Sequence, residues 1–113
     1  MTTALTIQGD VTSPAGRYVI GPLSIANTLA VGEIHTIDLA SGFNTVSVGD
    51  NSTGCILVPP SNNTSTIKIK GVTGDTGVLL SKTKPSVITL DSGVTNIGIT
   101  AGGAIANVQF VWF

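Results

Sequence analysis

The residues that could carry chemistry are few and scattered. The 113-residue chain has one histidine and one cysteine, and His35 and Cys55 lie far apart in the sequence. A nucleophilic thiol needs a neighbouring base, and a zinc site needs several such ligands close together. We therefore expect His35 to be a hydrogen-bonded strand residue and Cys55, in the apolar run 54–58, to be a buried free thiol. A single cysteine also excludes an internal disulfide and suits synthesis in a reducing compartment.

Six acidic residues complete the candidates, and no pattern in the sequence predicts that two of them meet in a cleft as acid–base catalysis requires. The segment Asp50-Asn51-Ser52 offers oxygen atoms but lacks the spacing and the carboxylates of a calcium loop. No nucleophile elbow, phosphate-binding loop or dinucleotide fingerprint occurs. Four of the six stand near glycine in turn contexts, where Asp bonds the local backbone: Asp10, Asp50, Asp75 and Asp91. We expect a protein that is not an enzyme and holds no cofactor and no metal.

The sequence around these residues favours β-strands. Forty residues are Val, Ile or Thr, whose branched side chains fit a pleated sheet. Turn-forming residues interrupt them about every ten residues, a rhythm typical of sandwiches and barrels. We predict one domain over 1–113, an all-β, jelly-roll-like antiparallel β-sandwich of eight to ten short strands. The predicted strands are 3–8, 17–20, 33–39, 45–48, 55–58, 65–70, 78–81, 86–90, 96–100 and 104–112. Residues 23–31 are expected to be a loop or irregular edge strand, with one helical turn as the alternative.

Alternating patterns predict which strand positions face inward. In 66–70, two isoleucines share one face, while Lys68 and Lys70 share the other and should meet solvent or an acidic partner. In 96–100, Gly98 falls on the outer side, which indicates a bulge or a close backbone approach.

The last four residues hold three of the five aromatic residues. Burying such side chains is worth about 1.5–3 kcal/mol each, so we predict that this final strand is central in its sheet. Phe110 and Trp112 share one face, which is expected to be core. Val111 and Phe113 point the other way, toward core or an interface.

The charge content restricts the partners. Only 10% of the residues are charged, the net charge is −1 and the mean hydropathy is +0.45. Nucleic-acid binding has no electrostatic support, no apolar run approaches the roughly 18 residues of a membrane helix, and no secretory signal is visible. So few charges cannot solvate a large free surface, which predicts a homo-oligomer covered by other protein. The predicted interface residues are Tyr18, Phe43 and Phe113.

Residues 54–113 also show a characteristic order of strands and turns, which is not a catalytic signature. The segments are an apolar strand at 56–58, Pro59-Pro60, the lysine-bearing strand 67–70, the turn 74–77 and a strand ending at Trp112. This pattern resembles small β-sandwich structural proteins of tailed-bacteriophage virions.

The resemblance implies a capsid decoration (cement) subunit, or a tail, collar or spike component. Its implied partners are two further copies in a trimer and other virion proteins such as the major capsid protein. It also implies a virion location after synthesis in the host cytoplasm without a signal peptide. The family has no defined site motif, so no functional residue carries over. The alternative is a carbohydrate-binding receptor-recognition module that stacks sugars on Tyr18 or Trp112.

Overall fold

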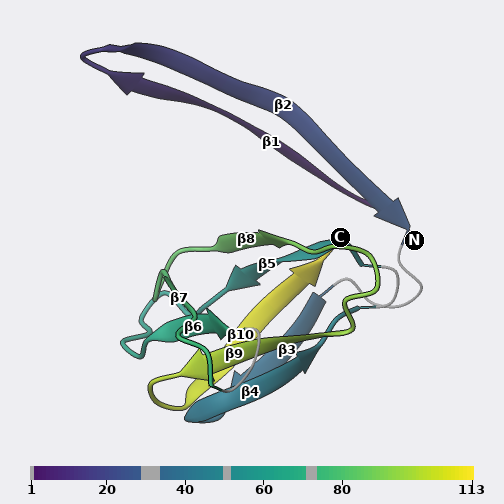
Figure 1. Ribbon diagram of the computed structural model, residues 1–113, viewed down its shortest axis with the longest axis vertical. Coiled ribbons are helices and arrows are strands. Elements are labelled where there is room, and N and C mark those ends of the chain that lie inside the picture. The colour runs from purple at the N-terminus through teal and green to yellow at the C-terminus, as the bar shows by residue number, and fades with distance from the viewer. Residues whose placement is uncertain (1, 29–33, 50–51, 71–73) are drawn as a thin grey trace.

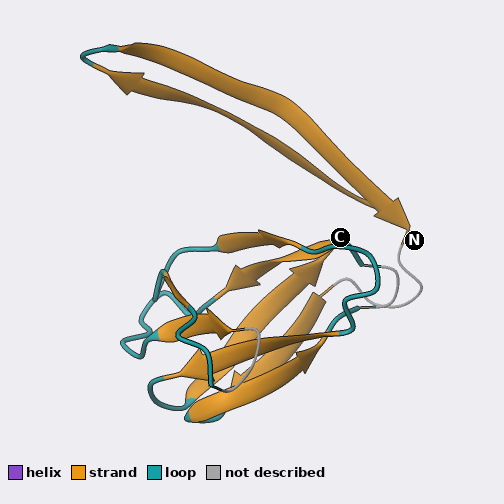
Figure 2. Cartoon of the chain, in the orientation of Figure 1, coloured by secondary structure: helices purple, strands orange, loops and turns teal. Residues whose placement is uncertain are grey.

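The computed structural model describes residues 2–28, 34–49, 52–70 and 74–113, with the backbone alone for 2–13 and 18–28. All regular structure in these residues is β-strand, which confirms the all-β prediction (Figures 1 and 2). The strands are β1 (Thr2–Ser13), β2 (Gly16–Thr28), β3 (Ile34–Leu39), β4 (Gly42–Ser47), β5 (Gly54–Val58), β6 (Ile67–Lys70), β7 (Val78–Leu80), β8 (Ser86–Thr89), β9 (Asn96–Ala101) and β10 (Ile105–Trp112).

Strands β3 to β10 form a jelly roll. One four-stranded sheet has the order β3-β10-β5-β8 and the other the order β4-β9-β6-β7. Each early strand pairs antiparallel with one late strand: β3 with β10, β4 with β9, β5 with β8 and β6 with β7. The chain from β3 to β10 is thus one long ribbon that folds back between β6 and β7. Curling this ribbon brings β10 beside β5 and β9 beside β6, which completes the two sheets.

Strands β1 and β2 lie outside this sandwich. They form a separate two-stranded antiparallel sheet, and Figure 1 shows this hairpin extending away from the eight-stranded body. The turn has the sequence Ser-Pro-Ala-Gly over 13–16, which suits a type I turn. In β2 the register shifts where Gly21 and Pro22 lie opposite Gln8, because proline cannot donate a ladder hydrogen bond.

The hairpin corrects two expectations. Residues 23–28, predicted as a loop or irregular edge strand, continue β2, which is an edge strand that pairs regularly with β1 as far as Thr2 and Thr28, so the loop and the helical turn are wrong. Residues 29–31 of that prediction lie outside the described part of the chain. The predicted strands 3–8 and 17–20 exist, but they pair with each other and not with a sandwich sheet.

The core lies between the two sheets, where the alternating positions predicted it. Phe110 and Trp112 are fully buried and stacked, with ring centroids 5.9 Å apart. Their strand β10 lies between β3 and β5, which confirms the predicted central position. The isoleucines at 67, 97 and 99 are buried as well.

Candidate interaction surface

One outer face of the sandwich carries a continuous apolar row. The register on the β3-β10-β5-β8 sheet aligns four β-branched residues, one from each strand. This row, which we call the apolar row, consists of Ile34, Val111, Ile56 and Val87. Ile34 and Val87 are 60% and 49% exposed, and the two central members are half-buried. Side chains of this kind in solvent usually mark an interaction surface when they lie together.

The rest of this face is almost uncharged. The adjacent row contains Thr36, Gln109 and Val58. Among the strand positions described on this face, the one charged residue is Asp38, at the far end of β3. Its Oδ1 accepts a hydrogen bond from the Asn107 backbone N–H at 2.9 Å. This bond secures a bulge in β10, where two residues oppose Asp38 and Asn107 has a φ of 59°.

The opposite outer face differs in charge. On the β4-β9-β6-β7 sheet, the register aligns Phe43, Thr100, Lys68 and Leu79 in one row. Lys70 follows in the next row, so we call this the lysine face. The predicted inward isoleucines and outward lysines of β6 are therefore confirmed. The two outer faces therefore differ in charge rather than in exposed apolar residues: the lysine face carries Lys68 and Lys70 but also exposes Leu79 and Phe43 at its two edges.

Gly98 explains the position of Phe43 on the lysine face. A Cβ atom at Gly98 would lie 2.7 Å from two carbons of the Phe43 ring and from the Lys70 carbonyl oxygen. The predicted close approach is therefore made by an aromatic ring and a neighbouring strand, while β9 pairs with β4 in regular register. Phe43 remains 37% exposed, so its predicted role at an interface stays a prediction.

The other two predicted interface residues occupy different places. Tyr18 lies on β2 opposite Val11, and its side chain is outside the described part of the structure. Phe113 is 1% exposed, so in this chain it offers no free surface to a partner. Its ring packs against Gly54, where an added Cβ would lie 2.7 Å from the ring.

Hydrogen bonds to residues 52–54 also hold the backbone of Phe113. The Phe113 carbonyl accepts hydrogen bonds from the Thr53 N–H at 2.8 Å and the Ser52 hydroxyl at 2.9 Å. Its N–H donates to the Gly54 carbonyl at 3.0 Å. Phe113 is therefore part of the folded sandwich, as the aromatic residues around it indicated. The sequence did not show that Gly54 leaves room for its ring.

The two exposed ends of the apolar row, Ile34 and Val87, were missed as interface candidates. The alternation of β3 carried a signal, because it places Ile34 on the side opposite His35 and Ile37. The alternation alone could not show that an apolar residue from each neighbouring strand continues the row, because strand order depends on pairings between distant segments.

His35 and Cys55 have structural environments, as expected. The Trp112 indole N–H donates to His35 Nδ1 at 3.0 Å, and the two rings meet edge to face with centroids 6.2 Å apart. Cys55 is fully buried, and desolvation raises the pKa of its thiol to about 12. Such a thiol is a poor nucleophile at neutral pH. Trp112 is also fully buried, so of the two residues named for the carbohydrate alternative it cannot stack on a sugar, and the side chain of the other, Tyr18, is not described.

The described acidic residues do not form a cluster of metal ligands. Among the described residues, no group of three His, Cys, Asp or Glu side chains could hold a metal ion. Asp91 accepts a hydrogen bond from the Ser92 backbone N–H at 2.9 Å, the turn chemistry that its sequence predicted. Asp50 and Asn51 of the considered calcium segment lie outside the described part of the structure.

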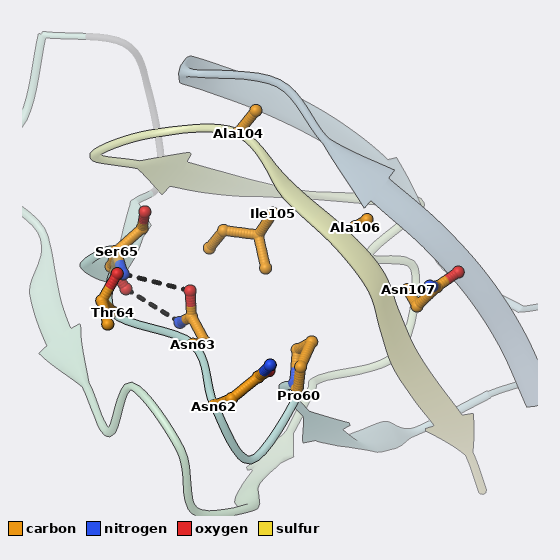
Figure 3. A pocket seen from close by; sticks show the side chains of 9 residues that line it. All are labelled: Pro60, Asn62, Asn63, Thr64, Ser65, Ala104, Ile105, Ala106 and Asn107. Atoms are coloured by element: carbon orange, nitrogen blue, oxygen red, sulfur yellow. Dashed lines mark hydrogen bonds between the residues drawn. The ribbon is translucent and has the colours of Figure 1, made fainter.

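A shallow hollow of about 410 Å³ lies between the 60–65 turn and the start of β10 (Figure 3). Its lining is polar but uncharged and lacks aromatic rings. The Asn63 Oδ1 accepts a hydrogen bond from the Ser65 backbone N–H at 3.1 Å. The Asn63 Nδ2 donates to the Ser65 carbonyl and to the Lys82 carbonyl, each at 2.9 Å. These bonds hold the turn that forms one wall of the hollow.

Comparison with known proteins gives no match to a family model, to a curated protein or to a solved structure. In the described part of the chain, no helix is long and apolar enough to cross a membrane.

Proposed function

We propose that this protein is a non-enzymatic structural subunit of a tailed-bacteriophage virion, a capsid decoration subunit that assembles as a symmetric oligomer. The apolar row on an almost uncharged sheet face is the observation that carries this proposal. In a free monomer Ile34 and Val87 would remain in water, whereas a neighbouring protein would cover them. Low overall charge and the resemblance of residues 54–113 to virion proteins add support.

The sheet edges support assembly as well. Each of the four edge strands has at least one exposed large apolar side chain, and such edges are open to pairing or packing with other chains. These side chains are Ile34 on β3, Phe43 on β4, Val78 and Leu79 on β7, and Val87 on β8. The jelly roll also occurs in viral capsid proteins. That likeness is an analogy of fold and supports the proposal only as one.

Light scattering of the purified protein, followed by co-sedimentation with purified phage shells, tests this function. We expect an oligomer, three copies by our proposal, that sediments with shells lacking their own decoration. Val87→Glu should weaken self-association or shell binding, because it places a charge in the apolar row. Thr45→Glu, at an exposed position on the lysine face, is the matched control and should change neither. A monomeric protein that binds no shell would contradict the proposal.

The alternative to a decoration subunit is a tail, collar or spike component, which could use the same apolar row as its interface. Co-sedimentation with separated heads and tails distinguishes the two positions in the particle. A carbohydrate-binding role would depend on Tyr18 or on Phe43, whose ring is partly exposed on the lysine face. A glycan array in which binding is lost on Phe43→Ala would favour that role.

A further inference from the structure

The surface of this chain is too large for a compact monomer. Its accessible surface is 6737 Å², whereas a globular protein of 11.4 kDa exposes roughly 5,800 Å². The radius of gyration is 15.2 Å, compared with roughly 13 Å for a compact domain of this length. The excess surface, roughly 900 Å², is close to the ~800 Å² that one partner loses in a standard protein interface.

The hairpin β1–β2 accounts for this extended shape, because it projects from the body in Figure 1. A two-stranded hairpin is marginally stable by itself in water and needs a covered face. Residues 2–28 contain only two charged residues, Asp10 and Arg17. Few charges are therefore available to keep a free ribbon of this length in solution.

The register gives this ribbon one apolar side. Leu5 lies opposite Ile25, and Ile7 lies opposite Leu23. Cross-strand partners and positions two apart along a strand share a face of the ribbon, so these four positions form one patch. The opposite face of the same segment has small or polar residues, Ala4, Thr6, Ser24 and Ala26.

We propose that the hairpin of one copy packs its apolar side on the apolar row of a second copy of this chain. Both surfaces are β-sheet faces with aliphatic residues and little charge, and such faces pack on each other in β-proteins. The second copy is the chosen occupant because this chain itself carries both uncharged aliphatic surfaces, and the surface excess has the size that one partner loses in a standard interface. The inference rests on the self-assembly part of the proposed function and does not require a phage shell.

The hairpin and the apolar row are different surfaces, so each copy both donates a hairpin and receives one. A contact between two different patches joins copies head to tail and closes into a ring when the rotation permits. The proposal therefore gives a physical basis for a closed oligomer with one hairpin on each sandwich.

Cysteine cross-linking in the full chain tests this contact directly. Leu5→Cys and Val87→Cys are made in separate chains, one of them carrying a tag, and are mixed and oxidised. We expect a mixed disulfide between the two chains, since the native thiol at Cys55 is buried and does not compete. Thr6→Cys with Thr45→Cys is the matched control, from the opposite face of the hairpin and the opposite outer face of the sandwich, and its yield should be at least about ten-fold lower. Equal yields from the two pairs would overturn the proposal.

A charge test gives an independent result. Leu5→Asp should raise the dissociation constant for self-association at least about ten-fold, whereas Thr6→Asp should leave it unchanged. In each variant, protection of the buried Cys55 thiol from a thiol-specific reagent verifies that the sandwich is folded. An oligomer that persists in Leu5→Asp would overturn the hairpin contact and leave the proposed virion function standing. A wild-type chain that is monomeric at all concentrations would overturn this contact, and shell co-sedimentation would then judge the virion function separately.

Discussion

The buried thiol of Cys55 should make the free energy of unfolding fall at alkaline pH. Burial raises its pKa to about 12 from an ordinary value of 9.0, because the thiolate would lose its hydration. The folded chain therefore holds this proton where the unfolded chain releases it. The stabilising effect is complete below about pH 9 and is lost as the pH rises toward the folded pKa.

The size of the effect follows from the two pKa values. Over the interval between them, each pH unit removes about 1.4 kcal/mol from the free energy of unfolding. One unit above the unfolded pKa, at pH 10, the thiol alone should therefore cost about 1.4 kcal/mol relative to pH 7. The wild-type curve by itself would mix the contributions of all groups that ionise at alkaline pH.

Urea unfolding of the wild type and of Cys55→Ala, at pH 7 and at pH 10, separates the thiol from these groups. Trp112 fluorescence reports the transition, since the indole is fully buried in the sandwich. Cys55→Ala should be less stable at neutral pH because it leaves a small cavity. The difference between the two proteins should shrink by about 1.4 kcal/mol at pH 10. Parallel pH dependence of both proteins would refute the reasoning, because the folded thiol would then ionise as readily as the unfolded one.

Three further substitutions test single contacts by their effect on the free energy of unfolding. His35→Ala should cost about 1–3 kcal/mol in urea unfolding, because it leaves the buried indole N–H of Trp112 without its acceptor; an unchanged value would contradict that bond. Gly98→Ala should cost about 1–3 kcal/mol, because its Cβ would meet an aromatic ring and a backbone oxygen at 2.7 Å. Gly74→Ala, which meets nothing within 4 Å, is its control and should stay within about 0.5 kcal/mol. Asn107→Val should lower the free energy of unfolding in urea, since a β-branched residue is strained at a φ of 59°, and a wild-type value would argue against the bulge.

The sequence predicted the fold class and the inward positions because these depend on local patterns. β-Branched composition and regular turn residues indicated an all-β sandwich, and period-two alternation placed Ile67, Ile97 and Trp112 in the core before any pairing was known. The solitary positions of His35 and Cys55 in the chain likewise indicated structural environments for both.

The tertiary structure decided which strands pair, and with that the candidate surface. Ile34 and Val87 become members of one row only because β3, β10, β5 and β8 lie side by side, and no local pattern contains that order. The pairing also separated the first two strands as a hairpin and buried Phe113 against Gly54. Alternation fixes the side of a strand on which a residue lies, whereas a surface needs strands that are remote in the chain to become neighbours.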